Sequence, residues 1–223
     1  MKNLLLVVLA LLTANQLSAQ CNPYYEFKEG MVMEMTNYDS KDKEEGRQVT
    51  TITSFNQESN GWVATMNVEV YDKKDKKVMD QEDVEIACEN GLIMIDMERF
   101  IPQESMQAFK DMDMDIKLDN LELPADLSVG QELDGGSMTM SGNLPMKMET
   151  SIYNRKVDSK ETITTPAGTF DCFVITYDMD IKMGMKRTMK GKEWIAKEVG
   201  VVKSASYKGN GKMIGYSLLT NVK

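Results

Sequence analysis

The feature that most constrains the fold is a two-residue alternation of apolar and polar side chains that recurs along most of the chain. Successive side chains of a β-strand point to opposite faces, so each such run predicts a strand with one apolar face. In the run 62–71 that face carries Ala64, Met66, Val68 and Val70. Further strands are predicted at 31–35, 49–55, 84–88, 92–95, 151–157, 170–182, 185–195, 199–207 and 212–221. The chain is therefore expected to be mainly β.

The connections between these runs predict antiparallel neighbours. Asn90-Gly91 stands between two apolar runs, and Asn-Gly is the strongest short signal for a hairpin. Residues 101–111 break the alternation, because Met106 and Phe109 follow a proline at helical spacing, and they predict a short helix. Many strands with short turns indicate a curved antiparallel sheet, or open half-barrel, with one or two short helices.

The first nineteen residues have the pattern of a secretory signal peptide. A basic start at Lys2 is followed by an unbroken apolar run from Leu4 to Leu12 and by the small residue Ala19 at the cleavage position. We expect cleavage after Ala19, which leaves residues 20–223 as a single antiparallel β domain. The protein is therefore expected to be exported, either to the periplasm or out of the cell.

A lipid anchor is the alternative reading of the same signal. A lipoprotein signal places a small residue directly before the acylated cysteine, whereas Gln20 precedes Cys21 here. We therefore expect no lipid at Cys21. The mature chain has no apolar stretch long enough for a transmembrane helix.

Composition excludes several kinds of chemistry. The chain has no histidine, which rules out Ser-His-Asp and Cys-His catalysis and HExxH zinc sites. The net charge of −9 argues against nucleic acid and against anionic membrane surfaces as main partners. No glycine-rich loop opens a helix, so nothing indicates a nucleotide. We expect a non-catalytic protein with no cofactor and no metal site.

Methionine occurs 20 times and forms stripes along several predicted strands. Three interpretations remain open: the stripes fill the core, they line a pocket for an apolar ligand, or their thioethers bind Cu(I). The core interpretation is the plainest, because methionine packs irregular space well. For the pocket interpretation, the candidate ligand-binding residues are Met112, Met114, Met138, Met140, Met179, Met183 and Met185.

Three segments together resemble a known family. They are Cys21-Asn22-Pro23-Tyr24-Tyr25-Glu26-Phe27-Lys28-Glu29-Gly30, Thr165-Pro166-Ala167-Gly168-Thr169-Phe170-Asp171-Cys172 and Glu193-Trp194-Ile195-Ala196-Lys197-Glu198-Val199-Gly200-Val201-Val202-Lys203-Ser204. The chain resembles the TapB-like family of exported bacterial proteins of unknown function, related to domain-of-unknown-function proteins with a lipoprotein-carrier-like curved sheet. This resemblance implies a half-barrel whose concave face could hold an acyl chain. It supplies no catalytic residue.

The three cysteines allow one disulfide in an oxidising compartment. Their spacing does not determine the pairing. In an up-and-down meander, Cys21 precedes the first strand and Cys88 ends the fourth, so both fall at one end of the sheet and we expect them to pair. Cys172 would then be a buried free thiol.

Two function classes follow from these observations. The first is a protein that binds an apolar or lipid-like ligand in a methionine-rich concave face. The second is a structural or protein-interaction component of the cell envelope, with an envelope protein as its partner and the methionines as ordinary core. Cu(I) binding through methionine is a third, weaker hypothesis.

Overall fold

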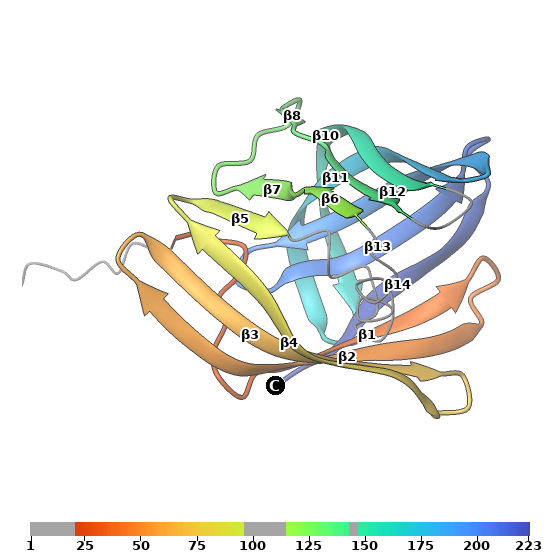
Figure 1. Cartoon of the computed structure of the whole chain (residues 1–223). Coiled ribbons are helices and arrows are strands. Elements are labelled where there is room, and N and C mark those ends of the chain that lie inside the picture. Colours follow the sequence, from red (N-terminus) through yellow and green to blue (C-terminus); the bar gives the residue numbers. More distant parts are fainter. Residues whose placement is uncertain (1–20, 96–114, 143–146) are drawn as a thin grey trace, which may run out of the picture.

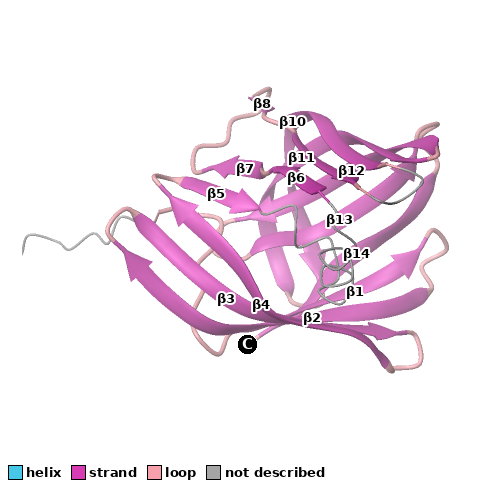
Figure 2. Cartoon of the chain, in the orientation of Figure 1, coloured by secondary structure: helices cyan, strands magenta, loops and turns pink. Residues whose placement is uncertain are grey.

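The structure is a computed structural model and describes residues 21–95, 115–142 and 147–223. These residues form one antiparallel sheet of fourteen strands and include no helix (Figures 1 and 2). The strands are β1 (Val32–Asp39), β2 (Glu44–Glu58), β3 (Gly61–Asp72), β4 (Lys77–Glu89), β5 (Leu92–Ile95), β6 (Asp115–Asp119), β7 (Leu121–Pro124), β8 (Glu132–Leu133), β9 (Gly136–Ser141), β10 (Met148–Thr165), β11 (Gly168–Met183), β12 (Met185–Ala196), β13 (Gly200–Lys208) and β14 (Met213–Val222). The predicted strands are confirmed, and none of them extends beyond the observed strand by more than one residue at either end.

The predicted hairpin at Asn90-Gly91 is also confirmed. β4 and β5 pair antiparallel, with Glu89 opposite Leu92. Asn90 has a φ of 52° and Gly91 a φ of 88°. A type I′ hairpin turn requires positive φ at both central residues, and asparagine and glycine tolerate it best.

The sheet is nearly closed by one short stretch of chain. The strand order runs β6-β9-β10-β11-β12-β13-β14-β1-β2-β3-β4-β5-β7, and β8 pairs with β10 beside this path. The two end strands are consecutive in sequence, because only Asn120 separates β6 from β7. β6 pairs with β9, whereas β7 pairs with β5. Residues 115–124 therefore connect the two edges of the sheet.

This closure corrects the expected fold class. An open half-barrel with one or two short helices is wrong, since the sheet is nearly closed and its described residues are all strands, turns and loops. The sequence does not reveal that residues 115–124 serve both edges, because a pattern of alternation specifies the faces of a strand and not its partners. The predicted helix at 101–111 lies outside the described residues. Within those ranges, no helix is long and apolar enough to cross a membrane.

A buried arginine ties the closing segment to the sheet. Arg155 of β10 is 5% exposed, and its Nη1 donates hydrogen bonds to the main-chain carbonyl oxygens of Glu122 in β7 and Asp134. A β-bulge between Tyr153 and Lys156 adds one residue to β10, which shifts the alternation and gives Arg155 its buried position. Burial lowers the pKa of Arg155. The charge is retained because a guanidinium titrates far above neutral pH.

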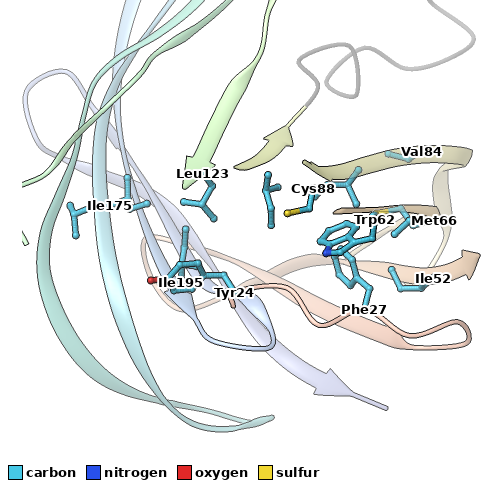
Figure 3. Close-up of a cluster of buried hydrophobic side chains, with 14 residues drawn as sticks. Tyr24, Phe27, Ile52, Trp62, Met66, Val84, Cys88, Leu123, Ile175 and Ile195 are labelled. Atoms are coloured by element: carbon cyan, nitrogen blue, oxygen red, sulfur yellow. The ribbon is translucent and has the colours of Figure 1, made fainter. Parts of the chain in front are cut away.

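The main core lies inside the curve of the sheet. Side chains from β2, β3 and β4 face side chains from β7, β11 and β12 across it (Figure 3). Phe27 packs edge-on against Trp62, with ring centroids 5.5 Å apart, and Tyr24 lies near Ile195 (Figure 3). A second cluster contains Leu121, Met138, Met140 and Ile152, and a third surrounds Trp194.

The N-terminal segment 21–27 crosses one end of this core. Cys21 forms a disulfide with Cys88 of β4, which closes a sequence separation of 67 residues. The buried amide of Asn22 donates to the carbonyl oxygens of Gly91, at 3.1 Å, and Leu123, at 3.0 Å. These contacts fix the residues that precede Tyr24, so the Tyr24 ring has a defined place beside β11 and β12.

Candidate ligand-binding groove

Three segments that lie far apart in the chain meet at one end of the sheet and line a groove of about 670 Å³. One is the end of β10 with the start of β11, the second is the end of β12, and the third contributes Tyr24. The lining residues are Tyr24, Lys160, Glu161, Thr162, Thr169, Phe170, Asp171, Cys172, Phe173, Ala196, Lys197 and Glu198. The volume is within the range usual for small-molecule sites.

Local turn chemistry places two of these segments. Between β10 and β11, the main-chain N–H of Ala167 donates to the Thr165 hydroxyl, and Gly168 has a φ of 149°. Between β12 and β13, the main-chain N–H of Glu198 donates to the carbonyl oxygen of Pro23 at 2.8 Å. The second turn therefore also anchors the N-terminal segment that carries Tyr24.

Aromatic rings supply the apolar part of the groove. Tyr24 meets Phe173 edge to face, with centroids 6.2 Å apart and an interplanar angle of 82°. Phe173 packs partly against the main core, whereas Phe170 packs against the third cluster. Alternation explains this division, because residues 170 and 173 lie on opposite faces of β11. Burial raises the pKa of Tyr24, so its hydroxyl is neutral at physiological pH.

Lysines and carboxylates form the polar rim of the groove. The Lys160 ammonium lies 4.6 Å from the centroid of the Phe173 ring, a cation–π contact that holds the charge above the apolar surface. Glu161 accepts a hydrogen bond from Trp194 Nε1 at 2.7 Å, and Asp171 accepts one from the Thr162 hydroxyl at 2.6 Å. Both carboxylates thus have donors within the protein, while Lys160 is exposed to solvent.

Cys172 is a free, buried thiol that lines the same groove. Burial is the main cause that raises its pKa, to about 11, and the carboxylates of Asp171 and Glu161 add to the shift. The thiol is therefore protonated at neutral pH and a poor nucleophile. This property argues against a catalytic role and suits a packing role.

The methionines predicted to bind a ligand do not form one surface. Met138 and Met140 are 5% and 2% exposed and belong to the second core cluster, where Met179 packs beside them. Met183 and Met185 stand opposite each other across Gly184 at the β11–β12 turn and are exposed. Gly184, which has a positive φ, separates Met185 from the strand that carries Met179.

Two of the candidate residues, Met112 and Met114, lie outside the described residues. None of the other five lines the groove. In the described ranges, no group of three or more histidine, cysteine, aspartate or glutamate side chains could hold a metal ion.

The sequence analysis placed the candidate site on methionines and did not predict this groove. The three segments that carry the family resemblance supply Tyr24, then Phe170 to Cys172, then Ala196 to Glu198. Lys160 and Phe173 were missed, because an exposed lysine and a strand phenylalanine carry no distinctive sequence signal. The clue available was that the three segments stand out together although they are distant in the chain.

Solved structures define the class of fold. One solved structure, from Bacteroides fragilis, is described as an exported protein with a YmcC-like fold. It matches this chain with a TM-score of 0.73 and 22% sequence identity, and the match covers 91% of this chain and 100% of that chain. A protein described as a lipoprotein from Parabacteroides distasonis has a TM-score of 0.75 and 22% identity, covering 92% and 100%. TM-scores at this level establish a shared fold. The chain has a YmcC-like fold.

The family follows from a sequence profile. The chain belongs to the DUF3108-like family, whose profile matches residues 28–219. The comparisons support the coarser part of the resemblance, a family of unknown function, and do not confirm the TapB-like name. The curated proteins contain no match to this chain.

Proposed function

We propose that this protein is an exported, non-catalytic binding protein that holds an apolar or lipid-like ligand in the groove beside Tyr24. The observation that carries the proposal is the convergence of three distant segments on one groove with aromatic walls and a polar rim that includes Lys160. The signal-peptide pattern of residues 1–19, together with relatives described as an exported protein and a lipoprotein, supports export.

The chemistry of the groove favours an amphiphile with an anionic head. An apolar chain would pack on Phe173 and Tyr24, and a carboxylate or phosphate head would lie at Lys160. The rim carboxylates Glu161 and Asp171 already accept hydrogen bonds from Trp194 and Thr162, so they leave Lys160 available to a ligand.

Lipid attachment at Cys21 is not part of this proposal. A cysteine engaged in a disulfide has no thiol for acylation, and Cys21 is bonded to Cys88. We expect the mature protein to lack a diacylglyceryl group. Its intact mass, measured by mass spectrometry with and without reduction, tests this expectation.

The first test of binding is native mass spectrometry of protein purified from its own host, followed by organic extraction. A reproducible bound apolar molecule supports the proposal. A second test titrates the purified protein with cis-parinaric acid, a fatty acid that fluoresces in apolar sites. An unliganded mass together with no saturable probe binding would overturn the proposal and favour a protein-interaction role in the envelope.

Point variants locate the site. Thr169→Trp fills the groove from an exposed position on β11 and should abolish probe binding. Thr188→Trp is the matched control, because Thr188 is also an exposed strand threonine with one side-chain hydrogen bond but lies outside the groove. Lys160→Gln should weaken the binding of cis-parinaric acid more than the binding of its methyl ester. Equal loss for acid and ester would contradict the role of Lys160.

A further inference from the structure

The β11–β12 turn concentrates exposed apolar surface at one point. Met185 is 76% and Met183 is 62% exposed, the highest values among the large apolar side chains that the structure describes as exposed. They flank Gly184, and every residue from 182 to 188 is exposed. Covering two neighbouring, largely exposed thioether side chains with an apolar phase is favourable in free energy.

The same turn is strongly basic in an acidic protein. Residues 182–192 contain five lysines and arginines and no aspartate or glutamate, while the whole chain has a net charge of −9. Lys182 pairs with Glu149, and Lys186 pairs with Asp180. Both lysines are more than half exposed, and exposed pairs of this kind are weak enough to exchange partners.

A neighbouring turn extends this basic surface. In the β12–β13 pairing Met189 lies opposite Lys208, and the β13–β14 turn that follows contains Lys208 and Lys212 with no carboxylate. Gly209 lies close to the main chain of Thr188. Ile214, at the start of β14, is 41% exposed. The two turns thus form one surface, which we call the cationic tip: Lys182, Met183, Met185, Lys186, Arg187, Lys208, Lys212 and Ile214.

We propose that the cationic tip docks the protein on an anionic phospholipid surface, with Met183 and Met185 entering the interface and the basic side chains contacting lipid phosphates. Charge complementarity favours this partner, because basic side chains around two exposed apolar side chains are complementary to an anionic bilayer. The net charge of the chain conceals this property, because the two turns themselves contain no carboxylate.

This inference is independent of the proposed ligand groove. β11 and β12 connect the two features, with the groove where β11 begins and β12 ends and the cationic tip at their shared turn. Variants at one end therefore serve as controls for the other. Thr169→Trp should leave membrane docking intact, and Met183→Ser/Met185→Ser should leave cis-parinaric acid binding intact.

The test is flotation of the full mature protein with phosphatidylcholine vesicles that contain phosphatidylglycerol. The wild-type protein should float with these vesicles, less so as salt increases, and should not float with pure phosphatidylcholine. Lys186→Gln/Arg187→Gln should lower affinity about fivefold per cation removed. Met183→Ser/Met185→Ser should lower it by at least a similar factor.

A matched control lies at the β3–β4 turn. It also has an exposed apolar residue, Val78 at 59%, near lysines, but it includes Asp72 and Asp75. Val78→Ser and Lys73→Gln/Lys74→Gln should leave flotation unchanged. Met185→Trp should show a blue-shifted emission on anionic vesicles, whereas Val78→Trp should not; native Trp62 and Trp194 are buried and provide a constant background.

Three results with vesicles would overturn the inference. They are absence of flotation at low salt, equal flotation on zwitterionic and anionic vesicles, and equal loss for cationic-tip and β3–β4 variants. Binding to polyglutamate without binding to vesicles would also overturn it and would indicate an acidic protein as the partner.

Discussion

The Arg155 guanidinium on β10 donates to the main-chain carbonyl oxygen of Glu122 on β7, 33 residues earlier in the chain, over 3.0 Å. β7 lies at one end of the strand order, while β10 is near the other end. The contact therefore joins the two edges of the sheet from the inside, close to the point where residues 115–124 connect them. A single buried side chain thus contributes to closure.

Replacing Arg155 should destabilise the protein strongly. Arg155→Met removes the donor to the carbonyl oxygens of Glu122 and Asp134, and we expect the free energy of unfolding to fall by about 2–4 kcal/mol. Urea unfolding followed by tryptophan fluorescence measures the change. Arg187→Met, at an exposed position, is the control and should change stability by less than about 0.5 kcal/mol. Equal effects of the two variants would show that the buried contacts contribute little.

The Cys21–Cys88 disulfide should contribute to stability through the chain it closes. Cys21→Ser/Cys88→Ser should lower the free energy of unfolding by about 2–5 kcal/mol, because a separation of 67 residues restricts the unfolded chain substantially. Denaturation of the oxidised wild type and the double variant under identical conditions measures this. Reduction of the wild type should reproduce the variant. Reduction should also destabilise the Cys172→Ala variant, because Cys172 is not part of the disulfide. If reduction did not change the stability of this variant, the pairing would be different.

Cys172 should resist alkylation in the folded protein at neutral pH. Its pKa is raised to about 11, so the reactive thiolate is scarce at pH 7, and the side chain is buried. The rate of reaction with iodoacetamide should rise as the pH approaches 11 or when urea unfolds the chain, as measured by mass spectrometry. Fast labelling at pH 7 without unfolding would contradict the burial.

The raised pKa of Cys172 also makes the stability of the protein depend on pH. In the unfolded chain the thiol titrates near its usual value of 9.0, whereas the folded protein keeps its proton up to about pH 11. The unfolded state therefore binds fewer protons between these values, and the contribution of Cys172 to stability should fall as pH rises from 9 to 11. Cys172→Ala should reduce this part of the pH dependence.

Two glycines with the same backbone conformation offer a matched comparison. Gly200 has a φ of 84° and Gly211 a φ of 83°. A Cβ at Gly200 would lie 2.2 Å from the Tyr25 ring, whereas at Gly211 nothing lies within 4 Å. Gly211→Ala should cost about 1–2 kcal/mol for the left-handed backbone, and Gly200→Ala should cost more because Tyr25 must move. Thermal unfolding of both variants measures the difference, and equal losses would mean that Tyr25 adapts without cost.

The strands and hairpins could be predicted because their signals are local. The alternation of Ala64, Met66 and Val68 requires only one strand with one buried face, and the Asn90-Gly91 turn requires only its own backbone angles. The candidate site was harder to predict. The stripes at Met138 and Met183 look alike in sequence, yet one is 5% and the other 62% exposed, because their places in the sheet differ.

The β content, the turns and the absence of histidine chemistry are properties of the sequence, since they depend on residue types and on neighbours a few positions apart. Contacts between distant residues decided the rest. Pairing of residues 115–124 with both edges closes the sheet, a bulge gives Arg155 its buried position, and three separated segments meet around Tyr24. The folded chain also gathers basic turns at one end of an acidic molecule. A linear pattern specifies which face of a strand is apolar, but only the register between strands determines what that face meets.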